Sequence, residues 1–129
     1  MRDPAFWWRP PGLAAGVLSP IATIYGAVAG ARLARPGRRT AMPVILSGNF
    51  TLGGSGKTPA TIAIAALLRS AGRSPVLLSR GYGGTLTGPV TVDPQVHTAA
   101  QVGDEALLLA QAAPTVVARD RVAGAAAAV

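Results

Sequence analysis

The stretch Gly48-Asn49-Phe50-Thr51-Leu52-Gly53-Gly54-Ser55-Gly56-Lys57-Thr58 decides how this chain is expected to fold. It follows a short apolar run at residues 43–47, which predicts a buried strand. It precedes residues 59–71, whose apolar spacing and closing glycine predict a helix. A glycine-rich turn between a strand and a helix that ends in Lys-Thr is typical of the phosphate-binding loop called Walker A. The sequence therefore predicts an α/β protein with a P-loop NTPase-like sheet and flanking helices.

The residue types of this loop suit a nucleotide. Glycines let backbone N–H groups approach a phosphate, and the following helix points the positive end of its dipole at the anion. Lys57, the only lysine in the chain, is expected to reach the β- and γ-phosphates, and the Thr58 hydroxyl is expected to ligate Mg²⁺. The predicted ATP-binding residues are Thr51, Leu52, Gly53, Gly54, Ser55, Gly56, Lys57 and Thr58.

The loop departs from the usual pattern at its first position, where Thr51 stands in place of a glycine. The three later glycines would supply the flexibility instead. The competing interpretation is a glycine-rich turn with an incidental lysine, and the strand before it and the helix after it disfavour that interpretation.

The rest of the chain supports a parallel sheet. Apolar runs at residues 75–79 and 115–118 predict core strands, and residues 90–92 predict a short one. Residues 103–113 and 122–129 have helical patterns. Strands that lack alternation and are separated by helices are typical of parallel sheets covered on both faces. With so few strands the sheet is expected to be incomplete, as in a truncated chain.

The N-terminal region, residues 1–40, is predicted to associate with membranes, ahead of a core at residues 41–129. No charge occurs from residue 10 to residue 31. Ser19-Pro20 predicts a helix start, with Ser as the N-cap, and the helix would run to about Arg35, too short to span a bilayer comfortably. An amphipathic helix on a membrane surface, with arginines at its end, is one interpretation. A helix packed on its own domain and a spanning helix stay open.

The composition narrows the classes of function. The chain has 129 residues, no cysteine and one histidine, which excludes a disulfide framework, a cysteine nucleophile and a multi-histidine zinc site. The net charge is +7, and residues 1–42 carry six arginines against one aspartate, which suits an anionic partner. With two Trp, two Tyr and two Phe, the chain has few aromatic rings on which single-stranded nucleic acid could stack, and no nucleic-acid partner is predicted.

Taken together, the motifs resemble those of the tetraacyldisaccharide 4′-kinases, the lipid A 4′-kinases. The resemblance rests on the loop at residues 47–59 and on three further segments in the same order and spacing. These are Leu78-Ser79-Arg80-Gly81-Tyr82-Gly83-Gly84, Val102-Gly103-Asp104-Glu105 and Ala118-Arg119-Asp120-Arg121. Thr51 is itself a feature of that family's loop. The resemblance covers nearly the whole chain.

The resemblance implies a kinase of lipid A biosynthesis at the cytoplasmic face of the inner membrane. It implies transfer of the ATP γ-phosphate, with Mg²⁺, to the 4′-hydroxyl of a tetraacyldisaccharide 1-phosphate, giving lipid IVA. By the same resemblance, Asp104 acts with Lys57 in catalysis, and the acceptor is expected near Arg80, Gly81, Arg119 and Arg121. From the residues alone, Asp104 could equally be an N-cap.

Family members are longer, with a second α/β domain and a paired-aspartate segment, so this chain alone is expected to be inactive. The alternative function is a truncated, non-catalytic nucleotide-binding module.

Overall fold

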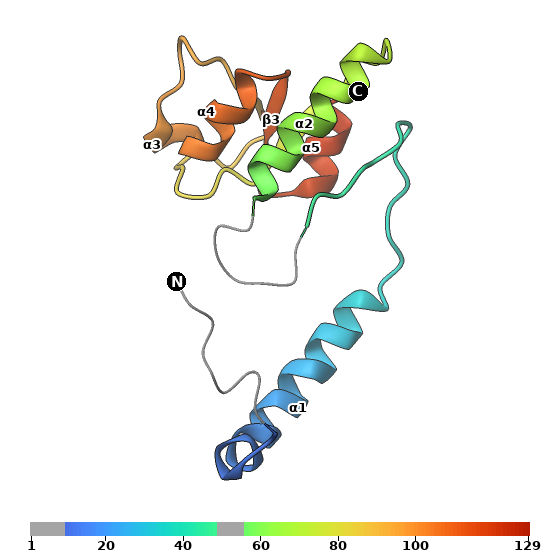
Figure 1. Cartoon of the computed structure of the whole chain (residues 1–129), viewed down its shortest axis with the longest axis vertical. Coiled ribbons are helices and arrows are strands. Elements are labelled where there is room, and N and C mark those ends of the chain that lie inside the picture. The colour runs from blue at the N-terminus through green and yellow to red at the C-terminus, as the bar shows by residue number, and fades with distance from the viewer. Residues whose placement is uncertain (1–9, 49–55) are drawn as a thin grey trace. The chain divides into compact units, whose positions relative to one another are not determined.

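The computed structural model describes residues 10–48 and 56–129. The chain divides into two compact units, Met1–Arg39 and Thr40–Val129. The first contributes one long helix, and the second contains a small sheet and the remaining helices (Figure 1).

The first unit contains α1, Leu13–Leu33, which begins well before the expected start at Pro20. The expectation that Ser19 caps the helix is therefore wrong. Pro20 lies inside α1, where its missing N–H leaves the carbonyl of Gly16 without its usual helical partner. The Ser19 hydroxyl donates a hydrogen bond to that carbonyl at 2.8 Å, which explains how the helix runs through a proline.

Because α1 starts earlier than expected, it is also longer than expected, and this bears on whether it could span a bilayer. Within α1, Ala15–Leu33 covers 19 residues with a mean hydropathy of 1.2, long and apolar enough to cross a membrane. At about 1.5 Å per residue it is about 28 Å long, close to the ~30 Å hydrocarbon core of a bilayer. The expectation that the helix is too short is thus wrong. A core helix or a signal sequence meets the same criterion.

The second unit is built on a three-stranded sheet of β1 (Leu77–Ser79), β2 (Val90–Thr91) and β3 (Thr115–Val117), in the order β1-β3-β2. β1 and β3 are parallel, which confirms the two predicted core strands. β2 is antiparallel to β3, so the expectation of a wholly parallel sheet is wrong at this edge. The physical reason is the connection from β1 to β2, which has no crossover helix to carry the chain back.

Among the described residues of this unit, four helices accompany the sheet. They are α2 (Lys57–Ser70), α3 (Ala99–Val102), α4 (Asp104–Ala110) and α5 (Arg121–Ala127). α2, α4 and α5 confirm the three predicted helices of the core. α4 ends three residues before the expected position at residue 113, because the chain turns there toward β3.

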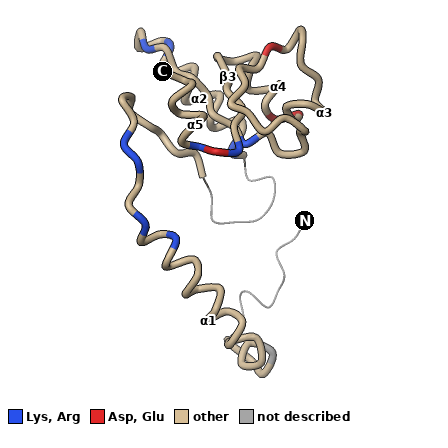
Figure 2. The backbone as a smooth tube through the Cα atoms, turned by 180° about the vertical axis from the view of Figure 1, so that it is seen from behind, with Lys and Arg blue, Asp and Glu red and all other residues tan. Residues whose placement is uncertain are grey.

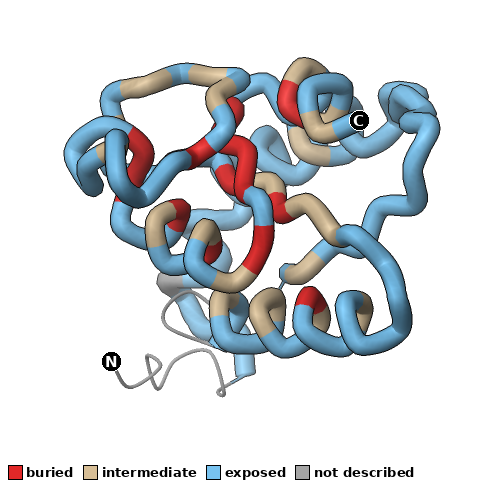
Figure 3. Tube along the Cα trace, turned by 90° about the horizontal axis from the view of Figure 1, so that it is seen from above, coloured by how far each residue is buried: buried red, intermediate tan, exposed pale blue. Residues whose placement is uncertain are grey.

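These helices cover both faces of the sheet. Leu77 of β1 lies in one buried cluster with Ala65 of α2 and Leu109 of α4. Leu78 instead lies against Gly124 of α5, where an added Cβ would come within 2.6 Å of a Leu78 methyl. Because consecutive strand residues point to opposite faces, α2 and α4 cover one face and α5 the other. The buried residues gather along this layered core (Figure 3).

One expected strand does not form. Residues 43–47 belong to no strand of the structure, and Val44, Ile45 and Leu46 are 71%, 62% and 90% exposed. The prediction of a buried strand there is wrong for this chain. An apolar run makes a segment suitable for a sheet, but a strand also needs a neighbour to bond with, and among the described residues no strand pairs with this segment.

Candidate functional site

The described part of the predicted phosphate loop is its last turn, at the start of α2. Gly56 is the N-cap, with φ of 76° and ψ of 18°, the left-handed region that glycine adopts without steric cost. Lys57 and Thr58 are the first two helical residues, so they stand at the positive end of the dipole of α2. The other predicted ATP-binding residues, Thr51, Leu52, Gly53, Gly54 and Ser55, lie outside the described residues.

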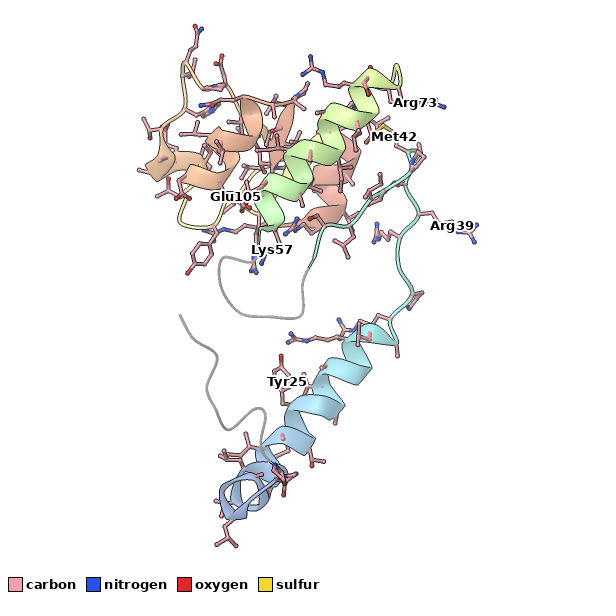
Figure 4. The ribbon with its side chains drawn as sticks, in the orientation of Figure 1. Tyr25, Arg39, Met42, Lys57, Arg73 and Glu105 are labelled. Atoms are coloured by element: carbon pink, nitrogen blue, oxygen red, sulfur yellow. The ribbon has the colours of Figure 1, made fainter. Side chains whose placement is uncertain are left out.

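A hydrogen bond joins this turn to the Gly-Asp-Glu segment. The Thr58 hydroxyl donates to a carboxylate oxygen of Glu105 at 2.7 Å, across 47 residues of sequence. Figure 4 shows Lys57 at the N-terminal end of α2 and Glu105 at the N-terminal end of α4. The start of α2 and the start of α4 therefore form one polar site.

Glu105 is the residue that sequence reasoning missed. The Gly-Asp-Glu segment was singled out, but only Asp104 was given a role. A second carboxylate one residue from the predicted catalytic one was the available signal, because hydroxyl and carboxylate oxygens are both ligands for hard cations. The sequence alone does not tell which carboxylate faces Thr58.

Asp104 occupies the first position of α4 and is not its N-cap. The N-cap is Gly103, with φ of 88°. The Asp104 carboxylate accepts a hydrogen bond from the N–H of Glu105 at 2.8 Å, and this satisfies one of the unpaired amides of the first turn. The interpretation of Asp104 as the N-cap is thus wrong, because Gly103 occupies that position. The Asp104 carboxylate nevertheless accepts a hydrogen bond from a backbone N–H of the first turn.

The glycine-rich loop that follows β1 packs against β3 and against the start of α4. Gly81 has φ of 70°, and a Cβ there would come within 2.5 Å of a Val117 methyl. A Cβ on Gly103 would come within 2.5 Å of the carbonyl oxygen of Tyr82. The loop therefore rests on β3 and on the turn that leads directly into Asp104.

Three predicted substrate-binding arginines follow the two parallel strands. Arg80 comes directly after β1, and Arg119 and Arg121 come just after β3. Because parallel strands end at the same edge of a sheet, these three residues share that edge, and they are exposed. A guanidinium N–H of Arg121 donates to the carbonyl of Leu78 at 3.5 Å. Figure 2 shows cationic and acidic residues following one another along this end of the unit.

Asp120, between the last two arginines, has a structural role. Its carboxylate accepts hydrogen bonds from the N–H groups of Val122 and Ala123 at 2.8 and 3.3 Å, which makes it the N-cap of α5. The Asp120 carboxylate thus accepts two hydrogen bonds from the first turn of its own helix. The arginines beside it are held at the start of a capped helix.

Two oxygen ligands of the kind that bind a divalent cation meet at this site. In residues 10–48 and 56–129, no three His, Cys, Asp or Glu side chains are grouped as a metal site. The Thr58 hydroxyl and the Glu105 carboxylate are 2.7 Å apart and are oxygen ligands of the kind Mg²⁺ prefers. Mg²⁺ typically binds one or two protein oxygens and completes its shell with phosphates and water, which this pair fits.

Comparison with known proteins identifies the family. A sequence profile described as "Tetraacyldisaccharide-1-P 4′-kinase" matches residues 14–129. A protein named tetraacyldisaccharide 4′-kinase from a Methylobacterium species is 62% identical over 128 residues, covering 98% of this chain and 39% of the relative. Proteins of the same name from Rhodopseudomonas palustris and Nitrobacter winogradskyi are 59% and 55% identical, covering 98% and 96% of this chain.

No solved structure matches the chain. The chain spans only 37% to 39% of the length of these curated relatives. The family profile nevertheless covers most of the chain, and it includes the start of α2, the glycine-rich loop and the Gly-Asp-Glu segment. The chain therefore belongs to the tetraacyldisaccharide-1-P 4′-kinase family.

Proposed function

We propose that the protein, at its natural length, transfers the γ-phosphate of ATP to the 4′-hydroxyl of a tetraacyldisaccharide 1-phosphate, the step that gives lipid IVA. Family membership supports the reaction class. The hydrogen bond between Thr58 and Glu105 carries the proposal at the level of structure, because it brings the end of the phosphate loop to the segment that holds Asp104. Phosphoryl transfer depends mainly on this kind of positioning and on neutralising charge.

The nucleotide would lie at the start of α2. The positive end of the helix dipole favours an anion there, and Lys57 adds a full positive charge. The loop residues 51–55 would wrap the phosphates. Thr58 and Glu105 would hold Mg²⁺, which supplies charge neutralisation at the β- and γ-phosphates when it is bound.

Asp104 would act on the acceptor. As a general base it accepts the proton of the 4′-hydroxyl, while that oxygen bonds to the γ-phosphorus and ADP leaves. Arg80, Arg119 and Arg121 would bind the sugar phosphate, because guanidinium groups bind phosphate oxygens in a bidentate manner. All three follow strands that end at this edge of the sheet.

The test of the proposal is transfer of labelled phosphate from ATP to the disaccharide in detergent–phospholipid mixed micelles. We expect label in the lipid product only when both ATP and Mg²⁺ are present. Binding of Mg-ATP without any transfer, at natural length, would instead support the nucleotide-binding module.

Glu105→Ala is expected to raise the Mg²⁺ concentration needed for half-maximal transfer at least about tenfold, because even the outer-shell partners of metal ligands typically contribute about 10- to 100-fold to metal affinity, and Glu105 would contact the ion directly. Titration of the rate with Mg²⁺ at saturating ATP measures the effect, and much of the rate should return at high Mg²⁺. Glu105→Gln keeps one oxygen ligand, so its Mg²⁺ requirement should lie between those of the wild type and Glu105→Ala. An unchanged Mg²⁺ requirement in Glu105→Ala contradicts the assignment.

We further propose that α1 and the arginines after it bind the cytoplasmic face of the inner membrane. The described large apolar side chains of α1 are exposed, with Ile21, Ile24 and Tyr25 at 66%, 67% and 76%. Arg35, Arg38 and Arg39 follow the helix and are exposed. An apolar helix followed by cations suits a bilayer whose surface carries anionic lipids.

Replacing Arg35, Arg38 and Arg39 together with glutamine is expected to weaken binding to vesicles that contain anionic phospholipid by about 100-fold, since each cation near such a surface contributes about 1 kcal/mol. Vesicle co-sedimentation at low salt measures the loss. Neutral vesicles should show little difference between the variant and the wild type. Arg73→Gln, which removes an exposed cation of the second unit, is the control. Equal losses on both kinds of vesicle contradict an electrostatic role.

A further inference from the structure

Tyr82 is an exposed aromatic residue at the edge of the sheet where the candidate site lies. It is 86% exposed, and it stands in the loop after β1 between Gly81 and Gly83. None of the roles assigned above uses it. Single exposed apolar side chains are common on protein surfaces and need no functional explanation. A role for Tyr82 therefore depends on how its backbone is held.

The backbone of this loop is held in place from two sides. Gly81 lies against Val117 of β3, and the carbonyl of Tyr82 lies against Gly103, where a Cβ would come within 2.5 Å of the oxygen. Further along, the N–H groups of Thr85 and Leu86 donate to the carbonyls of residues 100 and 101 at 3.0 and 2.9 Å. Tyr82 is thus an exposed ring on a backbone that is fixed against the turn before Asp104.

The contacts connect the loop of Tyr82 to the Gly-Asp-Glu segment. Thr58, at the nucleotide end, bonds to Glu105. Gly103, at the other end of the same segment, contacts the backbone of Tyr82. Asp104 lies between these two contacts in sequence, so the backbone of Tyr82 lies against the turn that leads directly into the residue proposed to act on the acceptor hydroxyl.

We propose that Tyr82 is a specificity-determining residue whose ring stacks on a sugar ring of the acceptor. The inference rests on the proposed function and deepens it. One face of a pyranose ring presents C–H groups with a slight positive charge, and the face of an aromatic ring is its negative region. Such stacking orients a sugar without a charged contact, while the neighbouring arginines bind phosphate. The contacts of the loop with Val117 and Gly103 hold its backbone in place for this role.

The experiment is steady-state kinetics of phosphate transfer by the natural-length protein, with ATP and the disaccharide varied separately. Tyr82→Ala is expected to raise the KM for the disaccharide about tenfold, the effect of losing roughly 1.4 kcal/mol of stacking. The KM for ATP and kcat should change less than about twofold. Tyr82→Phe keeps the ring and should behave like the wild type.

Val96→Ala is the matched control, because it truncates another highly exposed apolar side chain, at 70%, in the loop after β2. It should leave both KM values unchanged. As Tyr82 is itself so exposed, its truncation should leave folding intact, and an unchanged circular dichroism melting curve checks this.

The outcomes separate the two proposals. If the wild type transfers phosphate and Tyr82→Ala leaves the KM for the disaccharide unchanged, the role of Tyr82 is wrong and the proposed function stands. A rise in the KM for ATP instead would place the ring on the nucleotide, and equal losses in Tyr82→Phe and Tyr82→Ala would assign the effect to the hydroxyl; both overturn stacking on the sugar. No transfer by the wild type overturns the proposed function and this role with it.

Discussion

Replacing Lys57 with alanine is expected to lower kcat for phosphate transfer about a thousandfold, because it removes a positioned positive charge from the transferring phosphoryl group. Lys57 is the first residue of α2, and the dipole of that helix already favours an anion at the same place. The ammonium group adds a charge that the backbone cannot replace. A thousandfold loss corresponds to about 4 kcal/mol of transition-state stabilisation.

The measurement is the initial rate of transfer at saturating ATP and disaccharide. Arg73→Ala is the matched control, since it removes an exposed cation beyond the other end of α2 (Figure 4). It should keep the wild-type rate. Lys57→Arg should recover little activity, because a bulky planar guanidinium does not replace a compact ammonium at a phosphate group. A Lys57→Ala rate near that of the wild type removes the phosphate-loop assignment.

The parts of the fold that the sequence predicts well are those whose signal is local. The apolar runs that became β1 and β3 are buried between helices, so composition alone marks them as core. The start of α2 is also local information, because a glycine followed by Lys-Thr-Pro suits a helix N-terminus. The same holds for the helical spacing of α2.

The errors arise where a partner decides the structure. Residues 43–47 have the composition of a core strand, but composition cannot supply the neighbouring strand. Ser19-Pro20 looks like a helix start, yet the Ser19 hydroxyl satisfies the carbonyl that proline leaves free, and α1 continues through it. Glu105 was missed because its partner is distant in sequence, since its bond to Thr58 spans 47 residues.

Gly88→Ala is expected to destabilise the protein by about 4 kcal/mol, the combined cost of a strained backbone and a steric clash. Gly88 has φ of 68°, which L side chains rarely adopt, and a Cβ there would overlap the carbonyl oxygen of Val117 and come within 2.8 Å of the Cα of Ala118. Both neighbours are backbone atoms of the central strand or its end, so neither can rotate away. Chemical denaturation of wild type and variant measures the loss.

Gly83→Ala separates the clash from the strain. Gly83 also has a positive φ, of 80°, but a Cβ there would meet no atom within 4 Å. This variant should lose only about 1 kcal/mol, the cost of placing a side chain in the left-handed region. The difference between the two variants is then the contribution of close packing between the loop and the end of β3, where the N–H of Arg119 donates to the carbonyl of Thr87 at 2.9 Å. Equal losses in the two variants would mean that Gly88 is needed only for its backbone angles, and that the loop does not hold Arg119 by packing.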